Sequence, residues 1–320
     1  MPTTPEASTE PTPRAAAAFR SGFASIVGRP NAGKSTLTNA LVGAKIAITS
    51  AKPQTTRHAI RGIVHRPDAQ LVLVDTPGLH KPRTLLGERL NDLVRATWSE
   101  VDLIIVCLPA SDAIGPGDRF LVGQLATVTR TPKLAVATKT DLVSSDRLVE
   151  HLSQVQALAA AHGFAWEEIV PVSAVAGDRV DLLRDLLLRR LPEGPPLYPD
   201  GELTDEPEAT LVAELIREAA LEGVRDELPH SLAVVVEEMV PRAGRPDDRP
   251  LVDVRADLYC ERSSQKGIVI GHRGERLKKV GTNARVQIEA LLGTPVYLDL
   301  HVRVAKDWQR DPKQLRRLGF

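Results

Sequence analysis

Five short apolar runs recur along the N-terminal part of the chain, separated by segments with helical periodicity or polar character. Each run has four to eight residues without strict alternation, which is typical of strands buried on both faces of a parallel sheet. A more polar segment, residues 58–65, predicts a further strand at the edge of that sheet. The pattern therefore predicts an α/β fold in which a six-stranded, mostly parallel sheet carries helices on both faces. The five apolar runs are residues 23–27, 70–74, 101–108, 133–137 and 169–172.

The C-terminal part of the chain has a different pattern. Residues 251–260 alternate apolar and polar side chains, which predicts a strand with one buried face. Helical periodicity precedes this strand at 210–222 and follows it at 275–292. Residues 231–240 and 296–305 have the composition of two more strands. The order predicts a smaller α+β domain.

These patterns divide the chain into four parts. We expect a disordered N-terminal extension at 1–20, rich in Pro, Thr and Ala, and a first domain at 21–192. A proline-rich linker at 193–209 then leads to a second domain at 210–320 with a basic tail. Between Glu193 and Glu227 eleven acidic residues face only two basic ones, so we expect the helix there to present a solvated acidic face.

Composition sets further limits. Of the 320 residues, 42% are hydrophobic and 26% are charged, which is ordinary for a soluble globular protein. The 41 basic residues balance 41 acidic ones, so overall charge points to no class of partner. Cys107 and Cys260 lie far apart without metal-ligand spacing, which favours buried thiols, no zinc site and a reduced, cytoplasmic location. The sequence shows neither a membrane-spanning run nor a secretory signal.

The nine residues after the first strand match the phosphate-binding pattern GxxxxGK[ST]. Gly28 and Gly33 let the backbone turn so that N–H groups point at phosphate oxygens, and the next helix adds the positive end of its dipole. Lys34 is expected to reach the β- and γ-phosphates, and the Ser35 hydroxyl to bind Mg²⁺. The predicted phosphate loop, or P-loop, consists of Gly28, Arg29, Pro30, Asn31, Ala32, Gly33, Lys34, Ser35 and Thr36.

A second part of this site follows the strand at 70–74. That strand ends in Asp75-Thr76-Pro77-Gly78, where Asp75 would hold Mg²⁺ through its water shell and the Gly78 N–H would bond the γ-phosphate. A polar loop further upstream contains Thr55 and Thr56, and one of these hydroxyls would reach Mg²⁺ and sense the γ-phosphate. The sequence does not choose between the two threonines. The predicted metal ligands are Ser35, Thr55 or Thr56, and Asp75.

Two later strand ends predict where the base binds. The strand at 133–137 ends in Thr138-Lys139-Thr140-Asp141, at the edge where ligands bind in an open α/β sheet. The Asp141 carboxylate can accept hydrogen bonds from N1 and the exocyclic amine of guanine, a donor pair that adenine lacks, and Lys139 can pack over the base. The strand at 169–172 ends in Ser173 and Ala174, whose N–H groups would bond the guanine O6. The order of these motifs predicts GTP and GDP as ligands.

The second domain carries a candidate RNA-binding loop. Gly271-His272-Arg273-Gly274 is a GxxG sequence followed by a helix, as in the KH fold, where such a loop clamps the backbone of single-stranded RNA. Seven Lys or Arg and one acidic residue, Glu275, lie between Arg262 and Arg285, the most basic segment of the chain. The element order suits the type II KH arrangement. The predicted RNA contacts are Lys266, Gly271, His272, Arg273, Gly274, Arg276, Lys278 and Lys279.

Taken together, these motifs resemble the translation-factor-related GTPases and, more narrowly, the bacterial Era GTPases, small P-loop GTPases with a C-terminal type II KH domain. The resemblance extends from about Phe23 onward.

The family's base motif usually begins with Asn, whereas this chain has Thr138, so guanine affinity is expected to be lower. Leu79 stands where many GTPases carry a water-orienting Gln, so unassisted hydrolysis is expected at about 10⁻² s⁻¹ or less. Asn31 matches a position that supports a potassium ion in relatives; an equal alternative is that it only stabilises the loop. The residues assigned to catalysis are Lys34, Thr56, Gly78 and Asn31.

The resemblance also implies a biological setting. Era proteins bind 16S ribosomal RNA near its 3′ end and act in assembly of the 30S subunit, and some associate peripherally with the inner face of the cell membrane. A monomer is expected. The main alternative is an RNA-binding assembly scaffold with little or no GTP turnover. A metabolic P-loop kinase is a weaker one, because the sequence shows neither a phosphoacceptor site nor a lid.

Overall fold

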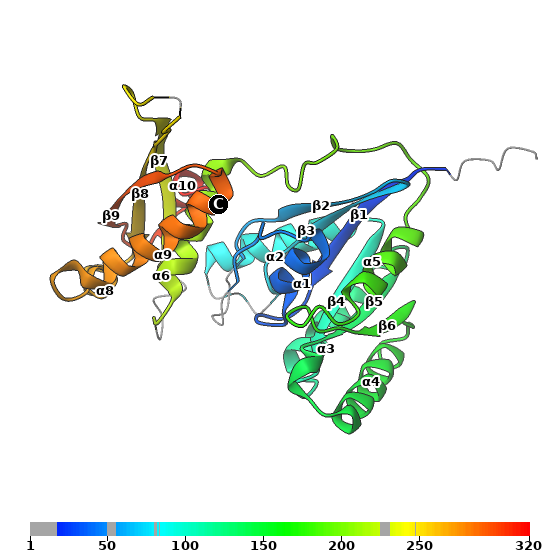
Figure 1. The fold of residues 1–320 in the computed structure, drawn as a ribbon. Coiled ribbons are helices and arrows are strands. Elements are labelled where there is room, and N and C mark those ends of the chain that lie inside the picture. The colour runs from blue at the N-terminus through cyan, green and yellow to red at the C-terminus, as the bar shows by residue number, and fades with distance from the viewer. Residues whose placement is uncertain (1–17, 50–55, 80–81, 83, 225–230, 247) are drawn as a thin grey trace, which may run out of the picture.

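The protein folds into a larger unit around a six-stranded sheet and a smaller unit around a three-stranded sheet (Figure 1). This computed structural model describes residues 18–49, 56–79, 82, 84–224, 231–246 and 248–320. Most of the predicted N-terminal extension therefore lies outside the described residues, as do Thr55 and parts of both loops that follow the P-loop helix and Gly78.

The larger sheet has the strand order β2-β3-β1-β4-β5-β6. β2 pairs antiparallel with β3 at one edge, and every other neighbouring pair is parallel. The predicted six-stranded, mostly parallel sheet is confirmed, including the edge position of the polar strand. Its strands are β1 (Arg20–Val27), β2 (Ile60–Arg66), β3 (Ala69–Asp75), β4 (Leu103–Pro109), β5 (Lys133–Thr138) and β6 (Glu168–Pro171).

Helices cover both faces of this sheet. One apolar core forms between the sheet and α1 and α5, and a second forms on the opposite face beneath α2, α3 and α4. The core side chains are mainly Leu, Val, Ile and Ala, and Cys107 is buried among them. The helices are α1 (Lys34–Val42), α2 (Leu85–Trp98), α3 (Pro116–Leu125), α4 (Ser145–Ala160) and α5 (Val180–Arg189), with a 3-10 turn, η1, at Thr140–Leu142.

The smaller unit is a three-stranded sheet with helices packed on one face. β7 and β8 pair antiparallel, whereas β8 and β9 are parallel, so the order helix, strand, strand, helix, helix, strand predicted from the sequence is confirmed. Its core lies between the sheet and α6, α8 and α9, and Cys260 is buried in it. The elements are α6 (Glu208–Leu221), β7 (Ala233–Pro241), β8 (Val252–Cys260), α8 (Ser263–Ile270), η2 (His272–Gly274), α9 (Glu275–Leu292), β9 (Val296–Val304), η3 (Trp308–Arg310) and α10 (Pro312–Arg317).

The connecting segment at 193–207 runs along the edge of the larger sheet. The side-chain oxygen of Gln70 accepts hydrogen bonds from the backbone N–H groups of Leu197 and Tyr198, at 2.6 and 2.9 Å. On the edge strand β2, the backbone N–H of Ile63 donates to the carbonyl oxygen of Leu203 at 2.9 Å. The Ile63 bond satisfies part of an otherwise open sheet edge, and all three bonds fix the path of the linker.

Helix α6 corrects one expectation. Its acidic side chains were expected to face solvent, yet Glu214 and Glu218 are both buried, each 7% exposed. Glu214 accepts from Arg217, which is itself 2% exposed, and Glu218 accepts from the backbone N–H of Thr49 in the larger unit at 2.8 Å. The solvated-face prediction was wrong for Glu214 and Glu218 because this helix packs between the two units, where these charges are paired instead of hydrated, whereas Glu208 and Glu222 are exposed.

Candidate nucleotide site and nucleic-acid interface

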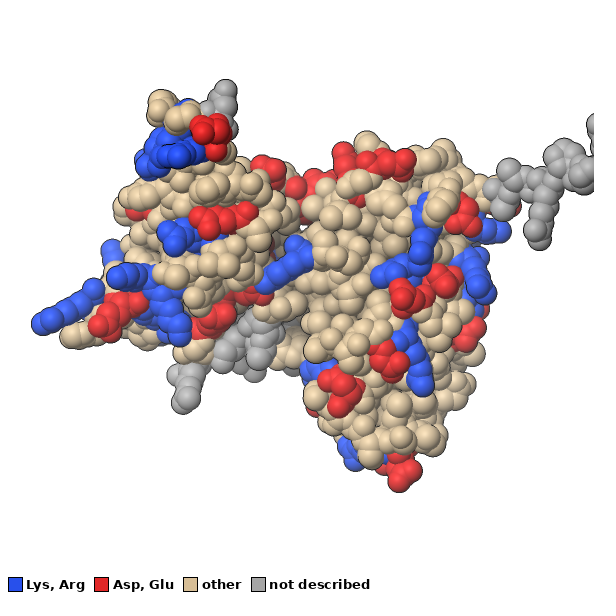
Figure 2. Space-filling model, in the orientation of Figure 1, with Lys and Arg blue, Asp and Glu red and all other residues tan. Residues whose placement is uncertain are grey.

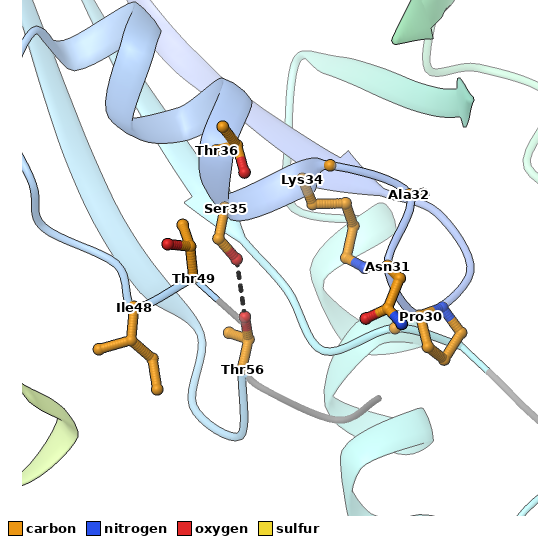
Figure 3. A pocket seen from close by; sticks show the side chains of 11 residues that line it. Pro30, Asn31, Ala32, Lys34, Ser35, Thr36, Ile48, Thr49 and Thr56 are labelled. Carbon is orange, nitrogen blue, oxygen red and sulfur yellow. Dashed lines mark hydrogen bonds between the residues drawn. The ribbon is translucent and has the colours of Figure 1, made fainter. Parts of the chain in front are cut away.

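The P-loop lines a pocket together with Thr49, Thr56 and Gly78 (Figure 3). Asn31 and Gly33 adopt left-handed backbone angles, with φ of 62° and 88°, which turn the loop ahead of α1. A Cβ atom on Gly28 would lie 2.9 Å from the carbonyl oxygen of Cys107, so only glycine fits where the loop leaves β1. The loop thus has the turn that a phosphate cradle needs, and the N-terminus of α1 faces it.

Lys34 and Asp75 are the two opposite charges beneath the pocket. Lys34 is 6% exposed, and its ammonium group donates to the carbonyl oxygen of Arg29 at 3.1 Å. Burial lowers the pKa of Lys34, and Asp75 works against that shift. Burial raises the pKa of Asp75 to about 6, while Lys34 and the nearby hydroxyls of Ser35 and Thr56 offset part of the shift. Burial therefore keeps water away from both groups, so each is stabilised by a partner of opposite charge.

The candidate metal ligands meet at one point of this pocket. The hydroxyls of Ser35 and Thr56 lie 2.9 Å apart, drawn as a dashed line in Figure 3. Neither oxygen of the buried Asp75 carboxylate meets hydrogen-bond geometry in the described part of the chain, although the Ser35 and Thr56 hydroxyls lie close enough to stabilise its charge. A buried carboxylate beside two hydroxyls is a set of hard oxygen donors that fits Mg²⁺ and its water shell. Of the two threonines, the structure brings Thr56 to this point, and Thr55 lies outside the described residues.

The strand ends at β5 and β6 come together as predicted. The Thr138 hydroxyl donates to the carbonyl oxygen of Ala32 at 2.7 Å and so connects the base loop to the P-loop. The Ser173 hydroxyl donates to the Asp141 carboxylate at 2.6 Å and fixes its orientation. Lys139 precedes Asp141 with a left-handed φ of 59°, and Ala174 follows Ser173. These side chains form the predicted base-binding edge.

Two residues of the Asp75–Gly78 turn connect it to its neighbours, Thr76 to β1 and Gly78 to the P-loop. The Thr76 hydroxyl donates to the carbonyl oxygen of Ile26 at 2.8 Å, so it anchors the turn to β1. A Cβ atom on Gly78 would lie 2.8 Å from the backbone nitrogen of Pro30, which brings this backbone against the P-loop. Leu79 is 2% exposed and packs in the core, so its side chain offers no polar group to a water molecule.

Arg29 of the P-loop points away from the phosphate side. Its guanidinium group pairs with Asp112 and, at 3.3 Å, with Asp118, which is 2% exposed. Those two carboxylates follow β4 and open α3. Arg29 therefore holds the outer side of the loop to the neighbouring strand end, a role that the loop pattern alone did not indicate.

The second unit has a groove beside the GxxG loop. A groove of about 750 Å³ runs between α8, α9 and β9, lined by Lys266, Ile270, Leu277 and Leu300 among others. A neighbouring pocket of about 360 Å³ shares Leu277 and Leu300 and extends to Lys278. An apolar floor with a basic rim suits single-stranded nucleic acid, whose bases pack on the floor while its phosphates meet the cations.

The GxxG loop has positive backbone φ angles, which its glycines adopt without strain. Gly271 and Gly274 adopt φ of 72° and 82°, and Arg273 between them adopts 48°. Arg276 donates to the carbonyl oxygen of Ala220 at 3.1 Å, so this predicted RNA contact also ties α9 to α6. Lys and Arg side chains gather at the end of the molecule that holds α8 and α9 (Figure 2). The predicted contacts Lys266, His272, Lys278 and Lys279 lie around this loop.

Comparison with known proteins identifies the family. Residues 23–139 match the family described as 50S ribosome-binding GTPase, and residues 227–309 match the KH domain. A curated relative from Streptomyces coelicolor named GTPase Era is 71% identical over 301 residues, covering 94% of this chain and 95% of the relative. The chain belongs to the Era GTPases. The larger unit is thus a P-loop GTPase domain, and the smaller one a KH domain.

Two solved structures extend this result. One is a crystal structure of Era in complex with MgGDPNP and nucleotides 1506–1542 of 16S ribosomal RNA, and the other is a single-residue variant of Aquifex aeolicus Era bound to GDP·AlF4⁻. Each is 34% identical to this Era GTPase with a TM-score of 0.88, covering 94% of this chain and 99% of the other. No helix in the described ranges is long and apolar enough to cross a membrane.

Sequence reasoning missed the residues that join the two domains of this Era GTPase. Arg57, next to Thr56, is buried against Trp308 and Phe320, and Glu218 holds the other end of the same loop at Thr49. Charged residues in a polar loop or on a helix face predict hydration, so no local signal marked them.

Proposed function

We propose that this Era GTPase couples a Mg²⁺-dependent cycle of GTP binding and hydrolysis to the binding of single-stranded ribosomal RNA. The observation that carries the proposal is that the Thr56 hydroxyl lies 2.9 Å from that of Ser35, beside the buried Asp75, in a chain with a basic KH groove. Bound Mg²⁺ would neutralise charge on the β- and γ-phosphates. Thr56 then detects the γ-phosphate, because its hydroxyl would reach the Mg²⁺ that this phosphate helps to bind.

The nucleotide roles follow from position. Lys34 binds the β- and γ-phosphates, the Gly78 N–H reaches the γ-phosphate, and Asp141 selects guanine. Because the side chain of Leu79 is apolar and buried, another group must orient the attacking water. We propose slow intrinsic turnover assisted by a potassium ion near Asn31. Hydrolysis that runs equally fast in sodium would contradict the potassium role.

The RNA role rests on the KH domain. The GxxG loop and its basic neighbours bind the RNA backbone, and the groove between α9 and β9 receives bases. The related Era crystallised with nucleotides 1506–1542 of 16S ribosomal RNA suggests the 3′ end of 16S RNA as the ligand. We extend this to a role in 30S assembly for a monomeric, cytoplasmic protein that associates reversibly with the inner membrane face.

Binding of labelled RNA tests this assignment. An oligonucleotide with the 16S 3′-end sequence should bind at least about tenfold more tightly than a scrambled RNA of equal length and composition, since each misread base costs on the order of 1 kcal/mol or more. Cells depleted of the protein should accumulate incomplete 30S particles. Equal binding of the two RNAs, or normal 30S particles after depletion, would contradict the ribosomal role.

One observation favours an alternative. Position 79 carries a buried leucine that offers no polar group to activate water, as expected of an RNA-binding scaffold with little turnover. The absence of hydrolysis with and without bound RNA, in either potassium or sodium, would favour the scaffold.

A further inference from the structure

Arg57 is a charged side chain buried in the contact between the two domains. It is 1% exposed, and one guanidinium nitrogen donates to the carbonyl oxygen of Leu232 at 2.7 Å. Its guanidinium carbon lies 5.6 Å from the ring centre of Trp308 and 5.9 Å from that of Phe320. Burial lowers the pKa of Arg57 to about 9, which leaves the side chain charged at neutral pH. A buried cation on two aromatic faces is costly to displace because it would lose these partners.

The C-terminal segment of the KH domain completes this pocket. Trp308 is fully buried, donates its indole N–H to the Ser231 carbonyl oxygen at 2.9 Å, and stacks on Phe320 at 5.5 Å between ring centres. Phe320 in turn stacks on His58, with 5.0 Å between the ring centres and 11° between the ring planes. Residues 57 and 58 of the GTPase domain are therefore both held by rings of the KH domain.

The same aromatic cluster reaches the helix after the Asp75–Gly78 turn. Arg89 of α2 donates to the main-chain oxygen of Phe320 at 2.8 Å. Leu86 and Leu90 of α2 pack in one apolar cluster with Trp308. Residues next to Thr56 and the helix that follows the Asp75–Gly78 turn thus both contact one small region of the KH domain.

The other end of the Thr56 loop is fixed in a similar way. The backbone N–H of Thr49 donates to the Glu218 carboxylate of α6 at 2.8 Å. The ammonium group of Lys45 donates to the same carboxylate and to the side-chain oxygen of Gln287 in α9. The KH domain therefore contacts the chain on both sides of the segment that leads to Thr56, through α6 and α9 before it and through Leu232, Trp308 and Phe320 after it.

We infer that Arg57, through Trp308 and Phe320, is a positioning residue that holds Thr56 against Ser35 and makes GTP hydrolysis depend on the KH domain. This inference rests on the proposed role of Thr56. Consecutive Cα atoms are about 3.8 Å apart across a rigid peptide plane, so the backbone of Thr56 follows any movement of Arg57. A displacement of about 1 Å at a reacting site can cost on the order of 100-fold in rate.

Single-turnover GTP hydrolysis by the full chain tests this inference. Arg57→Ala and Phe320→Ala should lower the rate by roughly 10- to 100-fold and leave GDP affinity unchanged, because Thr56 acts only while the γ-phosphate is present. Arg57→Lys, which keeps the charge but loses the planar contact with the rings, should retain an intermediate rate. Arg66→Ala is the control, since it removes an exposed arginine of β2 that pairs with Asp185, and it should leave the rate unchanged.

A double-mutant cycle with Thr56→Ala separates the positioning role of Arg57 from the proposed role of Thr56. If Arg57 acts through Thr56, Arg57→Ala should cause no further loss in the Thr56→Ala background. A full rate in Arg57→Ala and Phe320→Ala would overturn the positioning role even if Thr56→Ala is slow. A full rate in Thr56→Ala would instead overturn the proposed role of Thr56. If Arg57→Ala fails to fold, Phe320→Ala decides.

Discussion

The Thr138 hydroxyl donates a hydrogen bond to the Ala32 carbonyl oxygen across 2.7 Å, so the predicted base-binding loop is attached to the P-loop by a residue that departs from the family's usual asparagine. Thr138 is 3% exposed, and its hydroxyl also lies beside Gly33. Threonine thus preserves the link between the loops. It gives up the second polar group with which asparagine would contact the base.

Thr138→Ala should therefore weaken nucleotide binding. Leaving a buried acceptor without its donor costs about 1–3 kcal/mol, and the part of this cost that loosens the loop against bound nucleotide should lower GDP affinity by up to roughly 150-fold. Thr138→Asn should bind GDP at least as tightly as the unmodified chain. Titration with a fluorescent GDP analogue measures both, with Thr127→Ala, an exposed threonine on a helix end, as the control. Unchanged affinity in Thr138→Ala would show that the link is dispensable.

Asp141→Asn should change which base is accepted. The carboxylate can accept from two guanine donors, and the Ser173 hydroxyl at 2.6 Å already fixes its orientation. An amide presents one donor and one acceptor instead, which matches the carbonyl at position 2 of xanthine. We expect a large loss of GTP affinity, on the order of 100-fold, with a gain for XTP. Competition between the two nucleotides measures the switch, and parallel losses for both would argue against direct base reading.

Lys34→Ala should separate nucleotide binding from RNA binding. The substitution removes the cation expected at the β- and γ-phosphates, so GTP affinity and turnover should drop by more than about tenfold. RNA affinity of the nucleotide-free protein should stay within about twofold, because the GxxG groove belongs to the other domain. Anisotropy with labelled RNA checks the second point, and a matching loss of RNA binding would indicate misfolding.

Gly274→Asp should have the reverse effect. A Cβ atom there meets no atom within 4 Å, so besides the backbone strain of a side chain at φ 82° the substitution places a negative charge where RNA phosphates are expected. RNA affinity should fall more than about tenfold while GDP affinity is unchanged. Gly293→Asp is a matched control, since Gly293 has a similar φ of 65°, open surroundings, and a place at the opposite end of the 18-residue α9. Equal losses in the two variants would contradict the KH assignment.

The stability of the GTPase domain should depend on pH through His151. Burial lowers the pKa of His151, and the hydrogen bond from its ring to the Leu108 carbonyl oxygen at 3.2 Å offsets only part of that shift. Between the folded pKa and the ordinary value near 6.5, the unfolded chain binds more protons, so stability falls as pH decreases. Urea unfolding at about pH 7.5 and 5.5, on either side of that ordinary value, should show a smaller loss in His151→Gln. An equal loss in both proteins would exclude this residue as the cause.

The sequence predicted those parts of the site whose function depends on neighbouring residues in the chain. Gly28, Lys34 and Asp75 belong to a loop or strand end that a few neighbouring residues define, so their order along the chain predicted where the pocket lies. Arg57, Glu214 and Glu218 were different: each is polar, each was expected in water, and each is buried. Their burial depends on the packing of elements far apart in the chain, such as Arg57 on Leu232, which local patterns do not encode.

The proposed coupling of the two domains requires that GTP turnover respond to RNA held by the KH domain. Single-turnover GTP hydrolysis in potassium tests this requirement, with and without single-stranded RNA of the 16S 3′-end sequence, for the unmodified chain and for Gly274→Asp. We predict that RNA changes the rate at least about fivefold in the unmodified chain, the lower end of ordinary coupling between sites, and leaves Gly274→Asp unaffected. A rate that is identical with and without saturating RNA would contradict the account.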